Sequence, residues 1–433
     1  MILFNSRIQR FRGILSLFCA MVVTMVMAAA CGEKKTGVVP HGTVNDSESD
    51  DIVTLAIRYK NDAGFRRKIL EDSLVNPSNR YAQIRFANYE RNKWTQLPEA
   101  CFLARPVVRA DVGATVPTAP QKTGDAWESM EASSYEISEK NLLRRGEELF
   151  TRYPAQLAPS MVKALESAGA VSRYGLWQTD GSVGGLVWMV LPGGVYPAVT
   201  CSSCHASVDA RGEYRPGRPN HLIDSGKVKD DFYGRRTLYS TWGPGKVDVA
   251  GDGENNPVVI ADVRTVRFQT HLHRTANVKN SLEALAVRIE TGLIMAHRQS
   301  IRPTSLDAFA LAFYLWSLGD AVKSLPPASH PGRSVFERHC GNCHQGTGLS
   351  GQPVPTERLN SPVAEHPSSV RGTGYLNCVS LRGVSDRGRL LFGGEATGID
   401  AMFDPQRKAG GHFFGNRLSE SALRDLKAYL NAL

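Results

Sequence analysis

Two stretches of this chain share one pattern, Cys201-Ser-Ser-Cys204-His205 and Cys340-Gly-Asn-Cys343-His344. In each, two residues separate a pair of cysteines, and a histidine follows directly. If each stretch forms one helical turn, both thiols and the imidazole share a face, because residues three and four apart are neighbours on a helix. The sequence therefore predicts two places where one group is held by two sulfur atoms and a ring nitrogen.

This pattern is the attachment signature of c-type haem, whose porphyrin bonds to both thiols while the imidazole binds the iron as an axial ligand. Paired cysteines also occur in two other kinds of site. A redox-active dithiol does not need the following histidine. A structural zinc site needs four ligands, and pairing the two motifs around one zinc ion would leave both histidines unexplained. We therefore expect two covalently attached c-type haems, held by Cys201, Cys204, His205, Cys340, Cys343 and His344.

The N-terminus has the order of a secretory signal peptide. Three arginines precede an uncharged apolar run over residues 13–27, and three alanines follow at 28–30. The run is short for a membrane-spanning helix. Because Cys31 comes next, the segment resembles a bacterial lipoprotein signal, although Ala28 stands where that family usually has leucine. The resemblance implies a lipid anchor at Cys31, followed by a polar tether over 31–51, in a protein of the periplasm or cell envelope.

Composition and charge exclude a nucleic-acid-binding protein. The chain has 433 residues, of which 42% are hydrophobic and 21% charged, as in ordinary globular proteins of two or three domains. The net charge of +9 falls to +6 without the three signal arginines, and two haems would add about four carboxylates. We expect redox proteins of the bacterial envelope as partners. Cys101 and Cys378 either form a disulfide or are separate thiols.

The two motifs lie within a repeated frame. Before them stands Gly-x-x-x-Phe, at 146–150 and 332–336, and after them stands Tyr-Leu-x-x-Leu, at 314–318 and 429–433. This self-similarity indicates duplication, with each pair forming the first and last helix of a unit. The frame resembles the class I cytochrome c fold, in which these two helices cross at a glycine and an aromatic residue.

The resemblance implies a mainly α fold of two tandem cytochrome c-like haem domains, at 136–328 and 329–433, with residues 52–135 as a peripheral segment. Fifty residues separate Phe150 from Cys201, against three between Phe336 and Cys340. The first domain therefore carries a long insertion. Its Gly/Val-rich run at 184–190 predicts a short β-hairpin.

A third correspondence joins Asp262-Val-Arg-Thr-Val266 to Ser380-Leu-Arg-Gly-Val384. Arg264 and Arg382 occupy equivalent places, and a guanidinium suits a carboxylate, so we expect them to bind haem propionates. The stretches 380–384 and 391–394 also resemble the C-terminal domain of bacterial di-haem peroxidases. In that family a histidine stands where this chain has Phe392 or Gly393.

The sixth position of each iron decides the chemistry, since two strong ligands give an electron carrier and an open site permits peroxide chemistry. For the second haem Met402 is the first choice, in a loop where cytochrome c domains supply methionine, and His412 between glycines is its rival. For the first haem we expect His273, with His271 and Met295 as alternatives; alternation places both histidines on one side of an extended segment.

The sequence thus favours an exported di-haem c-type cytochrome that transfers single electrons. One alternative is a di-haem oxidoreductase of the peroxidase type with one open-site haem, for which Glu283 and Glu290 are candidate acids near the first haem. A second alternative is a haem-based sensor subunit. The sequence alone does not decide whether the protein is an enzyme.

Overall fold

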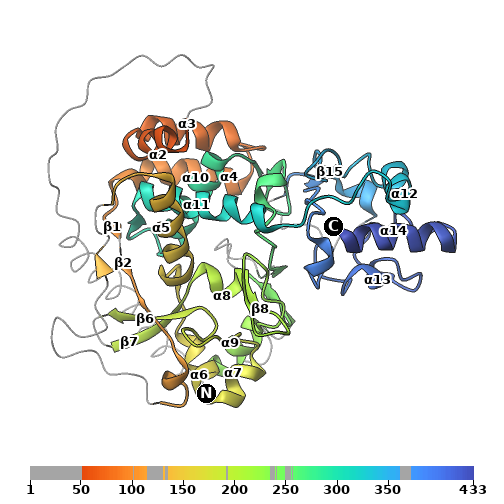
Figure 1. The fold of residues 1–433 in the computed structure, drawn as a ribbon. Coiled ribbons are helices and arrows are strands. Elements are labelled where there is room, and N and C mark those ends of the chain that lie inside the picture. The colour runs from red at the N-terminus through yellow and green to blue at the C-terminus, as the bar shows by residue number, and fades with distance from the viewer. Residues whose placement is uncertain are drawn as a thin grey trace, which may run out of the picture.

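The structure is a computed structural model, and it describes residues 51–100, 102–114, 130–131, 135–191, 194–234, 239, 241–248, 255, 257–360 and 372–433. The signal peptide, Cys31 with its tether, and Cys101 lie outside these residues. The fold is mostly helical with small sheets (Figure 1). No helix in the described part of the chain is both long and apolar enough to cross a membrane.

The α-helices are α2 (Ile52–Asn61), α3 (Ala63–Ser73), α4 (Arg80–Arg91), α5 (Glu139–Arg152), α6 (Val162–Leu165), α7 (Ala168–Arg173), α8 (Cys201–His205), α9 (Ser225–Tyr233), α10 (Leu282–Ala296), α11 (Ser305–Ser317), α12 (Pro331–His339), α13 (Ile399–Met402) and α14 (Glu420–Ala432). The strands are β1 (Glu99–Ala100), β2 (Phe102–Leu103), β3 (Arg105–Pro106), β4 (Met130–Glu131), β5 (Gln156–Leu157), β6 (Leu186–Leu191), β7 (Gly194–Val199), β8 (Ala206–Val208), β9 (Tyr214–Pro216), β10 (Lys246–Val247), β11 (Val258–Val259), β12 (His271–Leu272), β13 (Val278–Lys279), β14 (Arg302–Pro303), β15 (Val354–Pro355) and β16 (Tyr375–Leu376).

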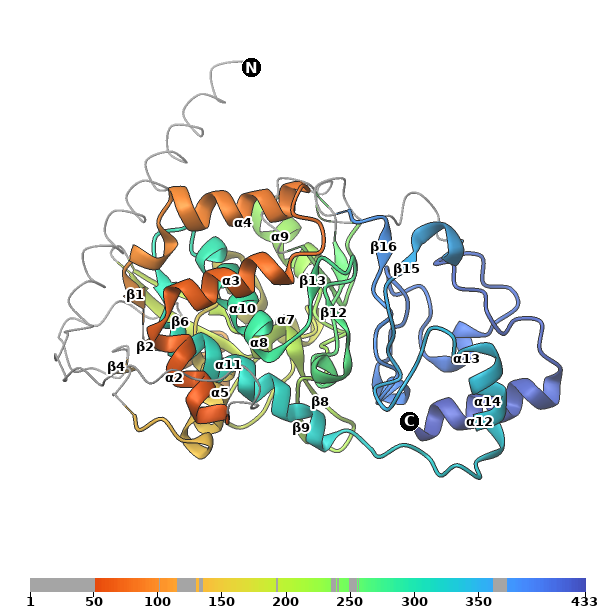
Figure 2. The same cartoon turned by 90° about the horizontal axis from the view of Figure 1, so that it is seen from above.

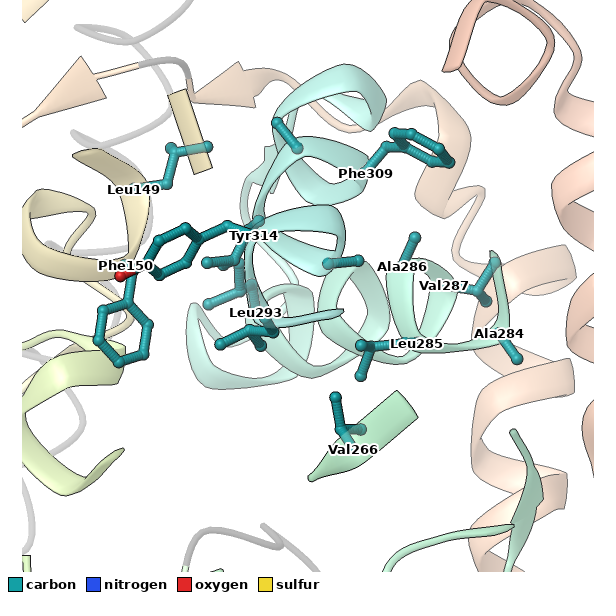
Figure 3. Close-up of a cluster of buried hydrophobic side chains, with 14 of the residues drawn as sticks. Leu149, Phe150, Val266, Ala284, Leu285, Ala286, Val287, Leu293, Phe309 and Tyr314 are labelled. Carbon is teal, nitrogen blue, oxygen red and sulfur yellow. The ribbon is translucent and has the colours of Figure 1, made fainter. Parts of the chain in front are cut away.

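Helices α5 and α11 cross where the sequence predicts. A Cβ atom on Gly146 would lie 2.2 Å from the Ala310 carbonyl oxygen and 2.5 Å from Cβ of Tyr314, so only glycine permits this approach. The rings of Phe150 and Tyr314 meet at 5.5 Å beside the crossing (Figure 3). The expected crossing is therefore confirmed in the first unit.

Helices α12 and α14 repeat this arrangement. A Cβ atom on Gly332 would lie 1.9 Å from the Asp425 carbonyl oxygen and 2.7 Å from Cβ of Tyr429. The rings of Phe336 and Tyr429 are 5.2 Å apart, and both residues belong to a separate hydrophobic cluster of the C-terminal residues. The close contact, the aromatic pair and their order along the chain therefore recur in the two helix pairs.

The N-terminal helices α2, α3 and α4 lie over α10 and α11 (Figure 2). They are more than a peripheral cover, because their aromatic residues enter the main core. Tyr59 on α2 and Tyr81 on α4 are buried in the main hydrophobic cluster, and the Tyr59 hydroxyl donates a hydrogen bond of 3.0 Å to Glu290 on α10. Residues 52–100 are therefore part of the folded body that contains the first motif.

The predicted hairpin is confirmed and is larger than expected. Strands β6 and β7 pair antiparallel from Leu186↔Val199 to Leu191↔Gly194. Two short strands extend the pair into a sheet of order β3-β6-β7-β5. The hairpin returns the chain to Thr200, so the first motif begins where the sheet ends.

Candidate cofactor-attachment sites

The first motif forms α8, and its serines fasten it to the hairpin. Ser202 and Ser203 are fully buried, whereas both cysteines and the histidine are half-buried. The Ser203 hydroxyl accepts a bond of 3.1 Å from the Thr200 amide and donates one of 2.9 Å to the Gly185 carbonyl. Since the serines use one face of the turn, the sulfur atoms and the imidazole are left together on the rest of it.

The second motif adds one turn to the end of α12. The amides of Cys343 and His344 both donate to the Cys340 carbonyl, at 3.1 and 3.0 Å. The thiol of Cys378, which is free and buried, donates to the Cys343 carbonyl at 3.1 Å. The pattern Cys-x-x-Cys-His is therefore coiled into one turn in both copies.

In both motif histidines a backbone carbonyl holds one ring nitrogen, which leaves the other for a different ligand. Nδ1 of His205 lies 2.9 Å from the Ala261 carbonyl oxygen, and Nδ1 of His344 lies 3.1 Å from that of Leu349. A carbonyl can only accept, so Nδ1 carries the proton and Nε2 keeps its lone pair. Burial lowers the pKa of His205, and lowers that of His344 to about 4. Two neutral imidazoles held in this way have the arrangement typical of metal ligands.

The thiols do not have the properties of a redox dithiol. Cys201, Cys204, Cys340 and Cys343 are all unbridged. Burial raises the pKa of Cys201 to about 12, and those of Cys204 and Cys340 to about 11, whereas reactive dithiols have a lowered pKa. The described residues contain no group of three or more His, Cys, Asp and Glu side chains placed to hold a metal ion.

In the second unit the structure places His412, not Met402, beside the motif histidine. The ring centroids of His344 and His412 are 6.3 Å apart, with 61° between the ring planes. Nδ1 of His412 is buried without a hydrogen-bond partner. Met402 ends α13 and is buried in the apolar cluster with Phe336 and Tyr429.

In the first unit the predicted ligands do not have the expected backbone conformation. Strand β12 contains only His271 and Leu272, and His273 has a φ of +64°. The prediction that both histidines share one side of an extended segment is therefore wrong. Nε2 of His273 accepts a hydrogen bond from Arg288, and Nδ1 of buried His271 lies 3.0 Å from the Thr270 hydroxyl. Met295 is half-buried on α10.

Two other histidines, which no motif marked, have buried and unpartnered ring nitrogens. His297 follows α10, and its ring bonds the backbone of Pro154 while Nε2 has no hydrogen-bond partner. This ring meets that of Tyr153 edge-on at 6.1 Å. His221 has no hydrogen-bond partner on either ring nitrogen. Burial lowers the pKa of each to about 4. Each is a single histidine in a segment without a recognisable motif, so no sequence pattern indicates either residue.

The equivalent arginines are already engaged. Arg264 forms a fork with Asp262, at 3.0 and 2.7 Å, and reaches Asp386 of the second unit at 3.3 Å. Arg382 donates to the carbonyls of Lys323 and Thr347. The two stretches share one local hydrogen bond: the backbone amide of each arginine donates to the side chain two residues earlier, which is Asp262 for Arg264 and Ser380 for Arg382. The Arg264 side chain is paired with carboxylates of the protein, whereas Nε of Arg382 is buried without a hydrogen-bond partner.

Two further arginines, Arg274 and Arg387, lie near one another. Nε of Arg274 is buried without a hydrogen-bond partner. Arg274 otherwise donates to the Leu391 and Val259 carbonyls, and burial lowers its pKa to about 10. Nε of Arg387 lies 3.5 Å from an Asp262 carboxylate oxygen, and burial lowers the pKa of Arg387, against the attraction of Asp262. An anionic group beside Arg274 would satisfy its Nε.

Comparison with known proteins adds little. No family model matches the chain, and no curated protein matches it. Among solved structures it is similar to a chain of hydrazine synthase from Kuenenia stuttgartiensis, studied under 20 bar of xenon. The match has 15% sequence identity and a TM-score of 0.34, and covers 74% of this chain and 100% of the other. At that TM-score the likeness supports no conclusion about function.

Proposed function

We propose that this chain is a di-haem c-type cytochrome that passes single electrons between redox proteins of the cell envelope. The observation that carries the proposal is the repeated donor set. Each motif offers two unbridged thiols and one imidazole whose Nδ1 is bonded to a backbone carbonyl. These are the groups that attach a c-type haem and bind its iron. When bound, haem supplies a one-electron redox couple.

The remaining residues hold and isolate the two sites. Cys201 with Cys204, and Cys340 with Cys343, would form the thioether links, while His205 and His344 bind iron through Nε2. The propionates would meet guanidinium groups, for which Arg274 and Arg382, each with a buried Nε that has no hydrogen-bond partner, fit better than Arg264, which is paired with Asp262. Hydrogen bonds between the units, such as that from the Thr270 hydroxyl to the Gly351 carbonyl at 2.5 Å, hold the two motifs in a fixed relation.

The test is the mass of the denatured protein, produced in a bacterium that matures c-type cytochromes. We expect the polypeptide plus two haem masses. The double variant Cys201→Ala/Cys204→Ala should keep one haem, and so should Cys340→Ala/Cys343→Ala. Cys378→Ala is the matched control, because this thiol touches the second motif but is outside it, and it should keep both haems. Wild-type protein without added haem mass would refute the proposal.

A peroxidase-type enzyme is less well supported. The acid predicted for it, Glu290, accepts a hydrogen bond from Tyr59 and lies 3.6 Å from Arg302, within the core that joins α10 to the N-terminal helices. A sensor would likewise need an open iron position. Absorption spectra separate these functions, because an electron carrier keeps two low-spin haems that do not respond to azide or peroxide. Export, and a lipid anchor at Cys31, are parts of the proposal that depend on residues outside the described structure.

A further inference from the structure

The pair His344 and His412 has the spacing of two imidazoles on one metal ion. A metal–nitrogen bond is about 2 Å long and a ring nitrogen lies about 1.1 Å from its ring centroid, so two imidazoles in line through a metal have centroids roughly 6.2 Å apart. The observed separation is 6.3 Å.

The ring nitrogens are also available. Nδ1 of His344 is committed to the Leu349 carbonyl, which leaves Nε2 for a metal. Nδ1 of His412 is buried without a hydrogen-bond partner. A buried polar nitrogen without a partner costs free energy unless a ligand satisfies it. The ring of His412 therefore has a buried nitrogen whose lone pair can bind a metal ion.

The backbone around His412 is strained and firmly held. His412 has a φ of +53°, which is uncommon for a residue other than glycine, and it follows two glycines that also have positive φ. Its amide donates to the Leu359 carbonyl at 2.6 Å. Arg407 donates to the carbonyls of Met402, Gly411 and His412, at 3.2, 2.8 and 3.2 Å. Strain of this kind persists where the surroundings fix it, commonly at ligand sites.

We propose that His412 is the sixth ligand of the iron held by His344, and that Met402 is a packing residue. This inference rests on the proposed function and replaces the methionine expected from the sequence. Met402 contributes to the apolar cluster of the second unit, a role for which a flexible apolar side chain is well suited. The two iron-binding imidazoles would come from the turn after α12 and from the loop before α14.

The test compares three variants of the full holoprotein. Wild type should show low-spin second haem without the near-infrared band of a sulfur–iron bond. In His412→Ala one of the two haems should become high-spin, and it should bind carbon monoxide when reduced. Added imidazole should restore the low-spin spectrum. His412→Met should introduce the sulfur–iron band and raise the reduction potential of that haem. Met402→Leu, the matched control, should leave all spectra unchanged.

The inference is overturned if Met402→Leu becomes high-spin while His412→Ala stays low-spin, or if wild type already shows the sulfur–iron band at this haem. Imidazole rescue and the potential of His412→Met separate ligation from a merely structural role of the loop. Loss of haem from Cys340 and Cys343 in the wild type is a different failure. It would refute the proposed function itself, and the mass of the denatured protein detects it independently of the spectra.

Discussion

Gly146→Ala should destabilise the first unit, although alanine is normally the better helix residue. In an unobstructed helix interior the change would stabilise by about 0.5–1 kcal/mol. Here the new Cβ would lie 2.2 Å from the Ala310 carbonyl oxygen, a distance that must grow to at least 3.0 Å. Because that oxygen belongs to the backbone, α5 and α11 must separate by about 0.8 Å. Overpacking of this kind costs about 1–3 kcal/mol, so we expect a net loss of about 1–2 kcal/mol.

Urea unfolding of the holoprotein, followed by circular dichroism, would measure the change. The main cluster of the first unit is separate from the cluster of the second, so the transition of the first unit must be fitted separately. Gly169→Ala on α7 is the matched control, because its Cβ would meet only the Ser167 hydroxyl, at 3.8 Å; it should stabilise. If Gly146→Ala is as stable as wild type while the control behaves as expected, the close helix crossing is refuted.

Three further changes test other parts of the structure. Asp307→Asn should destabilise by about 3 kcal/mol in chemical unfolding, because the buried Arg145 guanidinium, bonded to Asp307 at 2.8 and 3.0 Å, keeps only the more distant Glu148, at 3.6 Å, as counter-charge; a loss below about 1 kcal/mol would show that the pair is solvated. We expect His297→Ala to change the absorption of the haem proposed at the first motif and not that of the second, because the buried Nε2 of His297 has no hydrogen-bond partner and its ring packs on Tyr153 beside the end of α5; an unchanged spectrum would show that His297 does not bind that haem. Burial alone would raise the pKa of Asp111, but hydrogen bonds from its three donors outweigh burial and leave the pKa below its usual value. A lowered folded pKa stabilises above the unfolded pKa, and this stability is lost as the pH falls through the folded value; melting curves of Asp111→Asn below pH 5 should therefore depend less on pH than those of wild type.

The helical frame was predictable because its determinants are local and repeated. A glycine four residues before a phenylalanine, and a tyrosine on the closing helix, specify a close crossing wherever they recur, and the crossings at Gly146 and Gly332 have this form. The hairpin was predictable for the same reason, since alternation and flanking glycines are local signals. Its extension by β3 and β5 was not, because pairing between residues far apart in sequence leaves no periodic trace.

The ligand geometry was harder to predict, since it depends on backbone conformations that sequence patterns do not show. His273 was expected in an extended segment, but its positive φ ends the strand one residue earlier. The sequence favours Met402 over His412, because the cytochrome c domains that the chain resembles have a methionine in this loop. The bonds that place His412 come from Arg407 and Leu359, and neither residue belongs to a recognisable motif.

The two units have the same crossing of their first and last helices. Contacts between the units explain why the second cannot be treated as an independent module. Nδ1 of His205 is held by the Ala261 carbonyl, and the next residue, Asp262, pairs with Arg264 and approaches Arg387 of the second unit at 3.5 Å. The histidine of the first motif is therefore anchored one residue from a carboxylate that the second unit helps to fix, so this run of contacts links the first motif to the second unit.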